Sequence, residues 1–403
     1  MIFKLALRNV LRQKRRSILT ILTMVGGLML NAVSIGWTDG SYNSIIDSFT
    51  RNLTGHLQIH ARGFLDRPSL YKTIDGYRAV GAGIDSVPGV ESWAPRVYAA
   101  GLASVGDRST ACEIIGIDPA RDDRTTNFGA KVKRGLTLSP VASRQAVLGK
   151  GLAELLKADI DSQVVIVSQA ADGSIANDGY RVVGIASSGD EAGDRMAFYL
   201  HIADAQILLA LEGRVHELVV NTAGLARVAP ATSALRRRFT AQGLDVQPWQ
   251  VVARAFYQSM EADKRGNNVM FIIVMLIVAV GVLNTVLMSV LERTREFGVL
   301  KALGTRPWWI FKLVMAEVMT MAAISVVIGT AVGLAANYVL SIYGIRITPM
   351  DVGGMLFDTM RSEISVKTVV LPAGLVLLAS LLVAIFPARR ASLIEPARAM
   401  RIH

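Results

Sequence analysis

The sequence is poor in cysteine and in charged side chains, and each shortage excludes a class of protein. Cys112 is the single cysteine among 403 residues, so the chain can form neither an intramolecular disulfide nor a cysteine metal cluster. Charged residues make up 19% of the chain and hydrophobic residues 52%, which is too apolar for an ordinary soluble protein and too polar for a wholly embedded one. We therefore expect a membrane protein with a large water-exposed part.

Motifs of common enzymes are also missing. No G-x-x-x-x-G-K-[ST] phosphate loop occurs, and VLGKGLAEL resembles one only superficially. The segment HELVV lacks the second His of H-E-x-x-H, and no Ser lies within G-x-S-x-G. His56 and His60 would be roughly 13 Å apart along a strand, which is too far for joint metal ligation. We expect no catalytic residues, no metal site and no cofactor bound by this chain.

Four apolar runs are long enough to cross a membrane. A hydrocarbon core of about 30 Å requires roughly 20 apolar residues in a helix. The runs cover residues 18–38, 268–291, 312–342 and 367–387. The segment 39–267 between the first two is too long for a loop and is expected to be a domain. A signal peptide is the alternative for the first run, but the run is too long and no A-x-A-like site closes it.

The distribution of Lys and Arg predicts the orientation. The entry segment 1–17 contains several Lys and Arg residues and no Asp or Glu, and the tail 388–403 is also rich in arginine. Both termini are therefore expected in the cytoplasm. The connection 292–311 is basic, whereas the connection 343–366 has mixed charge. The domain 39–267 and the loop 343–366 then face outward. This bias explains the net charge of +11 more simply than nucleic acid binding does.

Strand and helix patterns alternate within the domain. Strands are predicted for GHLQIHA, TACEIIGIDP, SQVVIVSQ, GYRVVGIASSG and HELVVNT, and helices for GLAELLKA and ATSALRRRFTAQG. Apolar residues at helical spacing on both flanks, such as Phe49 and Phe256, predict that the first two spans continue as stalk helices. The predicted fold class is a membrane α-helical protein with four transmembrane helices and a large α+β extracytoplasmic domain inserted between helices 1 and 2.

The segment LERTREFGVLKALG, Leu291–Gly304, predicts a short amphipathic helix between the second and third runs. Gly304 suits a C-cap, and Pro307 prevents straightforward continuation. Two pairs have the i,i+3 spacing of helical ion pairs, namely Glu292 with Arg295 and Arg293 with Glu296. An apolar stripe that suits a groove on a partner consists of Phe297, Leu300 and Leu303.

Two features of the third run are also of interest. Gly329 and Gly333 are four residues apart, which would let another helix approach closely, although glycine is common in membrane helices. Glu317 is a carboxylate near the start of the run. An intramembrane carboxylate is a functional candidate, but one near the interface also snorkels or pairs.

Three segments resemble the FtsX-like permeases of type VII ABC transporters. NTVLMSVLERTREFGVLKALGTRPWWIFKLVMAE, Asn284–Glu317, resembles the family's span and coupling helix. LALRNVLRQKRRSILT resembles its entry helix and PARRASLIEPARAMR its C-terminal tail. The family includes lipoprotein-releasing permeases, MacB efflux pumps and FtsX division proteins. The outward domain also resembles the family's periplasmic domain in AVLGKGLAELLKADIDSQVVIV and YRVVGIASSG.

The resemblance implies a permease in the inner membrane that works with partners. ATP and Mg²⁺ would bind a separate cytoplasmic ATPase dimer, because this chain has no phosphate loop. A second permease subunit, identical or related, and a periplasmic chaperone or adaptor complete the expected assembly. The residues implied to couple to the ATPase are Glu292, Arg293, Arg295, Glu296, Phe297, Gly298, Leu300, Lys301, Leu303 and Gly304.

Lipoprotein release is the function we favour within the family. The segment LTGHLQIHARGF looks like that of lipoprotein-releasing permeases. Acyl chains would then enter a cavity between the outer halves of the first two spans, lined by Leu30, Val33, Trp37, Met270, Ile273 and Val274. The alternatives are a MacB-like mechanotransmitter for efflux of peptides or drugs, and an FtsX-like signalling permease.

Overall fold

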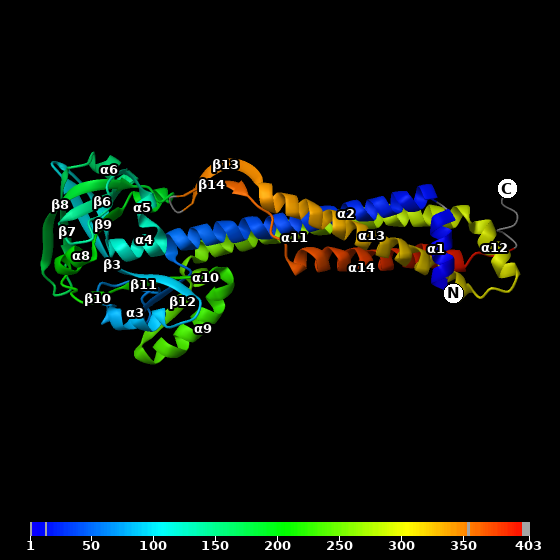
Figure 1. Cartoon of the computed structure of the whole chain (residues 1–403), viewed down its shortest axis with the longest axis horizontal. Coiled ribbons are helices and arrows are strands. Elements are labelled where there is room, and N and C mark those ends of the chain that lie inside the picture. The colour runs from blue at the N-terminus through cyan, green and yellow to red at the C-terminus, as the bar shows by residue number, and fades with distance from the viewer. Residues whose placement is uncertain (1, 13, 353–354, 397–403) are drawn as a thin grey trace. The chain divides into compact units, whose positions relative to one another are not determined.

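The computed structural model describes residues 2–12, 14–352 and 355–396. The chain divides into two compact units, each of which is described by itself. The helical unit comprises Met1–Tyr42, Met260–Arg346 and Thr359–His403. The sheet unit comprises Asn43–Ser259 and Ile347–Asp358. Figure 1 labels the elements of both units.

Six helices form the helical unit or enter it. They are α1 (Ile2–Arg12), α2 (Lys14–Phe49), α11 (Arg254–Glu292), α12 (Thr294–Ala302), α13 (Pro307–Tyr343) and α14 (Val366–Ser392). Among the described residues, α2, α11, α13 and α14 are long and apolar enough to cross a membrane.

These four helices extend beyond the apolar runs of the sequence. Helix α13 already begins at Pro307, ahead of the predicted span 312–342, and proline is well suited to the first turn of a helix. Helix α2 continues to Phe49, and α11 already begins at Arg254. Their polar ends correspond to the segments expected to form stalks.

Helices α2 and α13 pack closely through small residues. A Cβ atom on Gly329 would lie 3.2 Å from Leu28, and one on Gly333 would lie 3.1 Å from Cβ of Ala32. Nearby, Nδ2 of Asn337 donates a hydrogen bond to the carbonyl oxygen of Ala32 at 3.0 Å. The predicted close approach at the two glycines is therefore confirmed, and α2 is the helix that makes it.

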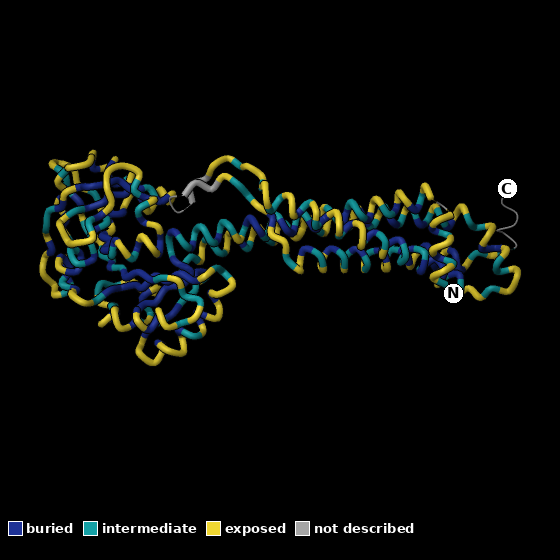
Figure 2. Tube along the Cα trace, in the orientation of Figure 1, coloured by how far each residue is buried: buried dark blue, intermediate teal, exposed yellow. Residues whose placement is uncertain are grey.

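Helix α11 is the least enclosed of the spanning helices. In its apolar part it buries one line of side chains at i,i+4 spacing, Val278, Val282, Val286 and Val290. Its other faces are largely exposed, as the yellow and teal trace in Figure 2 shows. In a single chain these faces are free for lipid or for another subunit.

The sheet unit is a mixed α+β domain. Its strands are β1 (Leu57–Ala61), β2 (Ile74–Asp75), β3 (Val90–Val105), β4 (Arg108–Ile117), β5 (Val132–Gly135), β6 (Gln145–Gly149), β7 (Gln163–Gln169), β8 (Ile175–Ala186), β9 (Ala197–His201), β10 (Arg214–Val215), β11 (Glu217–Thr222) and β12 (Leu244–Pro248). Its helices are α3 (Tyr77–Asp85), α4 (Pro119–Thr126), α5 (Phe128–Lys131), α6 (Lys150–Leu156), α7 (Glu191–Asp194), α8 (Ile202–Leu208), α9 (Val228–Phe239) and α10 (Trp249–Val252). A π-helix (Thr50–Thr54) and two 3₁₀ turns (Leu225–Arg227 and Thr240–Gln242) complete it.

One large sheet organises this unit. Its strand order is β12-β1-β11-β3-β4-β9-β6-β8-β5, and β7 pairs with both β3 and β8. Most pairs are antiparallel, whereas β4 with β9 and β6 with β8 are parallel. Neighbouring residues point to opposite faces, so Ile114 belongs to one hydrophobic core and Ile115 to another. Strands and helices predicted from the sequence lie in this unit.

The connection 343–366, predicted as a short loop, contains two strands that the sequence analysis did not predict. It contains β13 (Ile345–Val352) and β14 (Met355–Met360), which pair with each other. β-branched residues such as Ile345 and Ile347 favour extended backbone. These two strands lie between long apolar runs and are too short to be recognised from alternating hydrophobicity in the sequence.

Candidate functional site

Helix α12 forms where the sequence predicts a coupling helix. Helix α11 ends at Glu292, and Arg293 leaves the helical conformation with φ −98° and ψ 15°. Helix α12 ends in a Schellman motif, in which Gly304 N–H donates to Lys301 and Thr305 N–H donates to Leu300. Gly304 has φ +91°, a conformation that favours glycine. The predicted C-cap at Gly304 is confirmed.

The inner face of α12 belongs to the hydrophobic core of the helical unit. Phe297 is 1% exposed and Gly298 is also buried. Phe297 shares this core with Ile310 of α13 and Ala388 of α14, and Leu300 packs against it. The expectation that Phe297 belongs to a stripe free to enter a partner's groove is therefore wrong. The short helix uses its largest apolar side chain to attach itself to its own chain.

The outer face of α12 remains open. Leu303 is 79% exposed, and Val299 is also exposed. Arg295 and Glu296 lie on the same exposed side. Leu303 is thus the member of the predicted stripe that is available to another protein, together with Val299, which the sequence analysis did not single out.

The ion pairs around α12 agree with the sequence in one case and not in the other. Arg293 Nε lies 2.8 Å from Glu296 Oε2, which confirms that predicted pair. The predicted pair of Glu292 with Arg295 is wrong. Both carboxylate oxygens of Glu292 instead accept hydrogen bonds from the guanidinium of Arg16 of α2, in a bidentate ion pair. The helix breaks between Glu292 and Arg295, so their i,i+3 spacing no longer brings the side chains together.

Glu317 of α13 lies largely buried in a group of polar side chains next to the start of α12. Arg293 Nη1 donates to both Glu317 oxygens at 3.1 Å, and each side chain is 12% exposed. Asn9 of α1 donates to Glu317 Oε1 at 2.6 Å. The Arg293 guanidinium also lies over the ring of Phe297, 5.1 Å from its centre. We call Asn9, Arg293 and Glu317 the helical-unit anchor.

Lys301 provides a second attachment. Its Nζ donates to the carbonyl oxygens of Ser392 at 3.1 Å and Ile394 at 2.8 Å. These carbonyls lie at the C-terminal end of α14, where the last carbonyls of a helix lack intrahelical partners. Side chains at the start and on the inner side of α12 therefore contact α13 and the end of α14. Helix α1 joins this group of contacts through Asn9 and Glu317.

In the sheet unit, the end of α2 meets the large sheet through a π-helix. Thr50 Oγ1 donates to Ile46 at 2.7 Å, and the π-helix ends at Gly55 with φ +72°. A Cβ atom on Gly55 would lie 2.5 Å from Val219 of β11, so the backbone approaches the sheet more closely than other residues allow. π-Helical turns occur frequently at functional sites.

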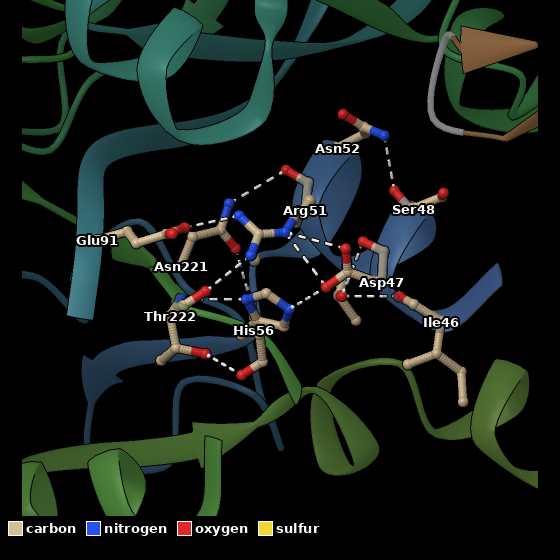
Figure 3. Close-up of polar contacts among 12 residues, drawn as sticks. Ile46, Asp47, Ser48, Arg51, Asn52, His56, Glu91, Asn221 and Thr222 are labelled. Atoms are coloured by element: carbon tan, nitrogen blue, oxygen red, sulfur yellow. Dashed lines mark hydrogen bonds and ion pairs between the residues drawn. The ribbon is translucent and has the colours of Figure 1, made fainter. Parts of the chain in front are cut away.

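Charged side chains reinforce this connection (Figure 3). Arg51 lies 3.0 Å from Asp47 and 2.7 Å from Glu91. Thr222 N–H donates to Nδ1 of His56 at 3.1 Å, so the other ring nitrogen carries the hydrogen and donates to Asp47 at 3.2 Å. We call Asp47, Arg51, His56 and Glu91 the sheet-unit anchor. Sequence reasoning considered His56 only as a metal ligand and missed this role.

In the part of the chain that the structure describes, no group of three His, Cys, Asp or Glu side chains could hold a metal ion. His60 instead lies 3.2 Å from Glu217 within the domain. Cys112 is buried, and burial raises the pKa of its thiol to about 12, which makes it unreactive.

The predicted substrate residues lie on an open surface. Leu30, Met270 and Ile273 are exposed, whereas Val33, Trp37 and Val274 are half-buried. Exposed side chains do not enclose a cavity within one chain, so the predicted cavity would need a second subunit to close it. The six residues are divided between α2 and α11.

Comparison with known proteins agrees with this architecture. Residues 17–238 match the MacB-like periplasmic core domain, and residues 268–396 match the FtsX-like permease C-terminal domain. The chain is 25% identical to the lipoprotein-releasing system transmembrane protein LolC of Neisseria meningitidis serogroup B, over 98% of each chain. It is 24% identical to the macrolide export ATP-binding/permease protein MacB of Campylobacter jejuni, over 99% of this chain and 61% of that protein.

Among solved structures, the chain is similar to the periplasmic region of MacB from Actinobacillus actinomycetemcomitans. That region aligns with 53% of this chain and 98% of its own, at 15% sequence identity and a TM-score of 0.39. The family matches cover α2, most of the sheet unit and the later candidate membrane helices, so the protein is a membrane protein with a periplasmic domain. The chain belongs to the FtsX-like permeases with a MacB-like periplasmic core domain, which are the permeases of type VII ABC transporters.

Proposed function

We propose that the chain is an inner-membrane permease subunit that uses ATP hydrolysis on a separate protein to release lipoproteins. The observation that carries this choice is the similarity to a LolC protein over 98% of both chains, whereas the MacB protein is matched over 61% of its length. Both termini and α12 would lie in the cytoplasm. ATP and Mg²⁺ would bind the ATPase, and this chain would bind no cofactor.

Helix α12 would be the element that the ATPase moves. Its exposed outer side chains, Val299 and Leu303, offer apolar contacts flanked by Arg295 and Glu296. Its inner side is attached to α13 and α14 by Phe297, Lys301 and the helical-unit anchor. Because these contacts are partly or fully buried, α12 would transmit a displacement to the helices it contacts.

The stalk ends of α2 and α11 would carry the displacement to the periplasmic domain. On the α2 side, the π-helix and the sheet-unit anchor connect the stalk to β3 and β11 through Glu91 and Thr222. On the α11 side, Phe256 stacks on Phe49 of α2 with ring centres 4.0 Å apart. The two stalk ends would therefore move together.

Acyl chains would enter between the outer halves of α2 and α11. Leu30, Met270 and Ile273 offer an apolar surface there, and a second permease subunit would enclose it. A C₂ dimer is the default for a single known chain, although two related chains could form the same assembly.

Two experiments test the proposal. Copurification with an ATPase subunit tests the transporter assignment, and its failure would exclude it. Depletion of the chain tests the substrate: lipoproteins destined for the outer membrane should then accumulate in the inner membrane. Normal lipoprotein sorting after depletion would exclude lipoprotein release while leaving the transporter assignment intact.

Efflux of a peptide or drug is the second candidate function. The match of residues 17–238 to the MacB-like periplasmic core domain favours it. This function requires a periplasmic adaptor, so deletion should cause drug or toxin sensitivity and the adaptor should copurify. An FtsX-like signalling role would instead leave both lipoprotein sorting and drug sensitivity unchanged.

A further inference from the structure

Helix α1 has an exposed amphipathic face that the transport function does not use. Its exposed apolar side chains are spaced four residues apart: Phe3, Leu7 and Leu11. The residue after each of them is basic and exposed: Lys4, Arg8 and Arg12. Residues with this spacing share one side of a helix, so an apolar stripe and a cationic stripe run side by side along α1.

The opposite side of α1 is bound to the rest of the helical unit. Ala6 and Val10 are buried, and Ser17 of α2 donates a hydrogen bond to the carbonyl oxygen of Val10 at 2.8 Å. Figure 1 shows α1 drawn across the long axes of the spanning helices, at the end of the unit where α12 lies. A helix across the spanning helices lies parallel to the membrane surface.

The two stripes match the boundary between acyl chains and headgroups. An in-plane helix of this kind buries its apolar side chains and places Lys and Arg among the lipid headgroups. Helix α1 contains no acidic residue. The side chains of Lys4, Arg8 and Arg12 form no ion pair or hydrogen bond with another described residue. Their charges are therefore available to anionic headgroups.

Helix α1 is also connected to the coupling helix. Asn9 lies on its bound side and donates to Glu317, which is held in turn by Arg293 at the start of α12. A change in the position of α1 therefore alters the support of α12. We infer that α1 binds the anionic lipid surface through its two exposed stripes and that this binding sets how well α12 couples to the ATPase. The second half of this inference rests on the proposed function.

The lipid half can be tested on the chain alone. With Cys112→Ser and Phe3→Cys, a spin label at position 3, which is 70% exposed in the native protein, reports the depth of α1 in the bilayer. In phosphatidylcholine vesicles that contain phosphatidylglycerol, the label should lie deeper than in phosphatidylcholine alone, and high salt should reverse the difference. Each cation near such a surface strengthens attachment roughly fivefold.

A triple variant and a charge-matched control make this test specific. Lys4→Ser, Arg8→Ser and Arg12→Ser together should abolish the effect of phosphatidylglycerol. The control, Arg108→Gln with Lys150→Gln and Arg237→Gln, removes the same charge from exposed positions of the sheet unit and should preserve it. Equal label depth with and without phosphatidylglycerol would overturn the inference. The inference would also be overturned if the label became shielded from solvent only when an ATPase is added, because the exposed face of α1 would then bind a protein and not lipid.

The coupling half uses the complex with its ATPase. Phosphatidylglycerol should raise the ATPase activity of the native complex, and the triple variant should lose this response. Asn9→Ala should lose it too while its label depth stays native, because the lipid-binding face is intact and only the connection to Glu317 is removed. A full ATPase response in Asn9→Ala would refute the connection to α12. If no ATPase associates at all, the proposed function fails, while the depth measurement still stands.

Discussion

The helical-unit anchor and the sheet-unit anchor both hold a helix by a carboxylate and an arginine, but in different surroundings. Arg293 and Glu317 are each 12% exposed. In the sheet unit, Arg51 is 33% exposed and its partners Asp47 and Glu91 more so. The first pair lies largely buried beside the inner side of α12, and the second lies in partial contact with solvent.

This difference determines what each anchor contributes. A buried charge that loses its partner is left without solvation, which is strongly destabilising. A half-exposed charge that loses its partner is hydrated by solvent instead, so the free energy of unfolding decreases only slightly. The helical-unit anchor should therefore make α12 rigid, whereas the sheet-unit anchor should orient the stalk and still allow it to adjust.

The largest effect should follow removal of Glu317. Glu317→Ala leaves the largely buried Arg293 with the exposed Glu296 as its remaining partner and should destabilise the chain by about 3 kcal/mol, which lowers the thermal unfolding midpoint in detergent. The double variant Glu317→Leu with Arg293→Leu removes both charges and should regain most of that loss. If the double variant is no more stable than the single one, the anchor does not act as a buried ion pair.

The two sides of α12 should respond differently to substitution. Phe297→Ala empties a site in the core and should cost about 3 kcal/mol of stability. Leu303→Asp changes an exposed position, so stability should stay within about 0.5 kcal/mol of the native value, while stimulation of the ATPase and transport are lost. Ala302→Ser, at a neighbouring exposed position, serves as the matched control. Native transport in Leu303→Asp would exclude this side as the ATPase contact.

Local features of this site could be predicted from the sequence. The cap at Gly304 and the pair of Arg293 with Glu296 depend on residues a few positions apart, and helix geometry specifies such contacts. The break after Glu292 was not predicted. The close approach at Gly329 and Gly333 followed in the same way, because small residues at i,i+4 spacing share one helix face. Membrane spans were predictable from length and hydropathy.

Contacts between distant segments could not be predicted. Asn9 and Glu317 are 308 positions apart, and no pattern in either segment specifies the other. The burial of Phe297 also depends on the positions of α13 and α14, which its local sequence does not specify. An apolar side chain on a short helix suits a groove on a partner and the core of its own chain equally well. His56 was missed because its partners, Asp47 and Thr222, come from different elements.

A smaller effect is expected at the sheet-unit anchor. Arg51→Gln removes the contacts to Asp47 and Glu91 and should cost about 1 kcal/mol, seen as a modest decrease in the unfolding midpoint and faster hydrogen exchange in β1. Arg134→Gln is the control, because Arg134 forms an exposed pair with Asp159 and should change neither quantity. A loss as large as that of Glu317→Ala would contradict the proposed difference between the anchors.

Lys131 differs from both anchors, because a proton and not a mutation changes its charge. Lys131 is buried beside Arg96 and Asp122; burial and the Arg96 charge lower its pKa to about 7, although Asp122 opposes the shift. Between pH 7 and the usual pKa of about 10.4, the unfolded chain holds a proton that the folded chain has released. The free energy of unfolding should therefore rise with pH in this range, and Lys131 should contribute at most about 1.4 kcal/mol per pH unit to that rise. Lys131→Met should lose this dependence between pH 7 and 9 in thermal unfolding, and an unchanged slope would show that Lys131 stays charged in the folded domain.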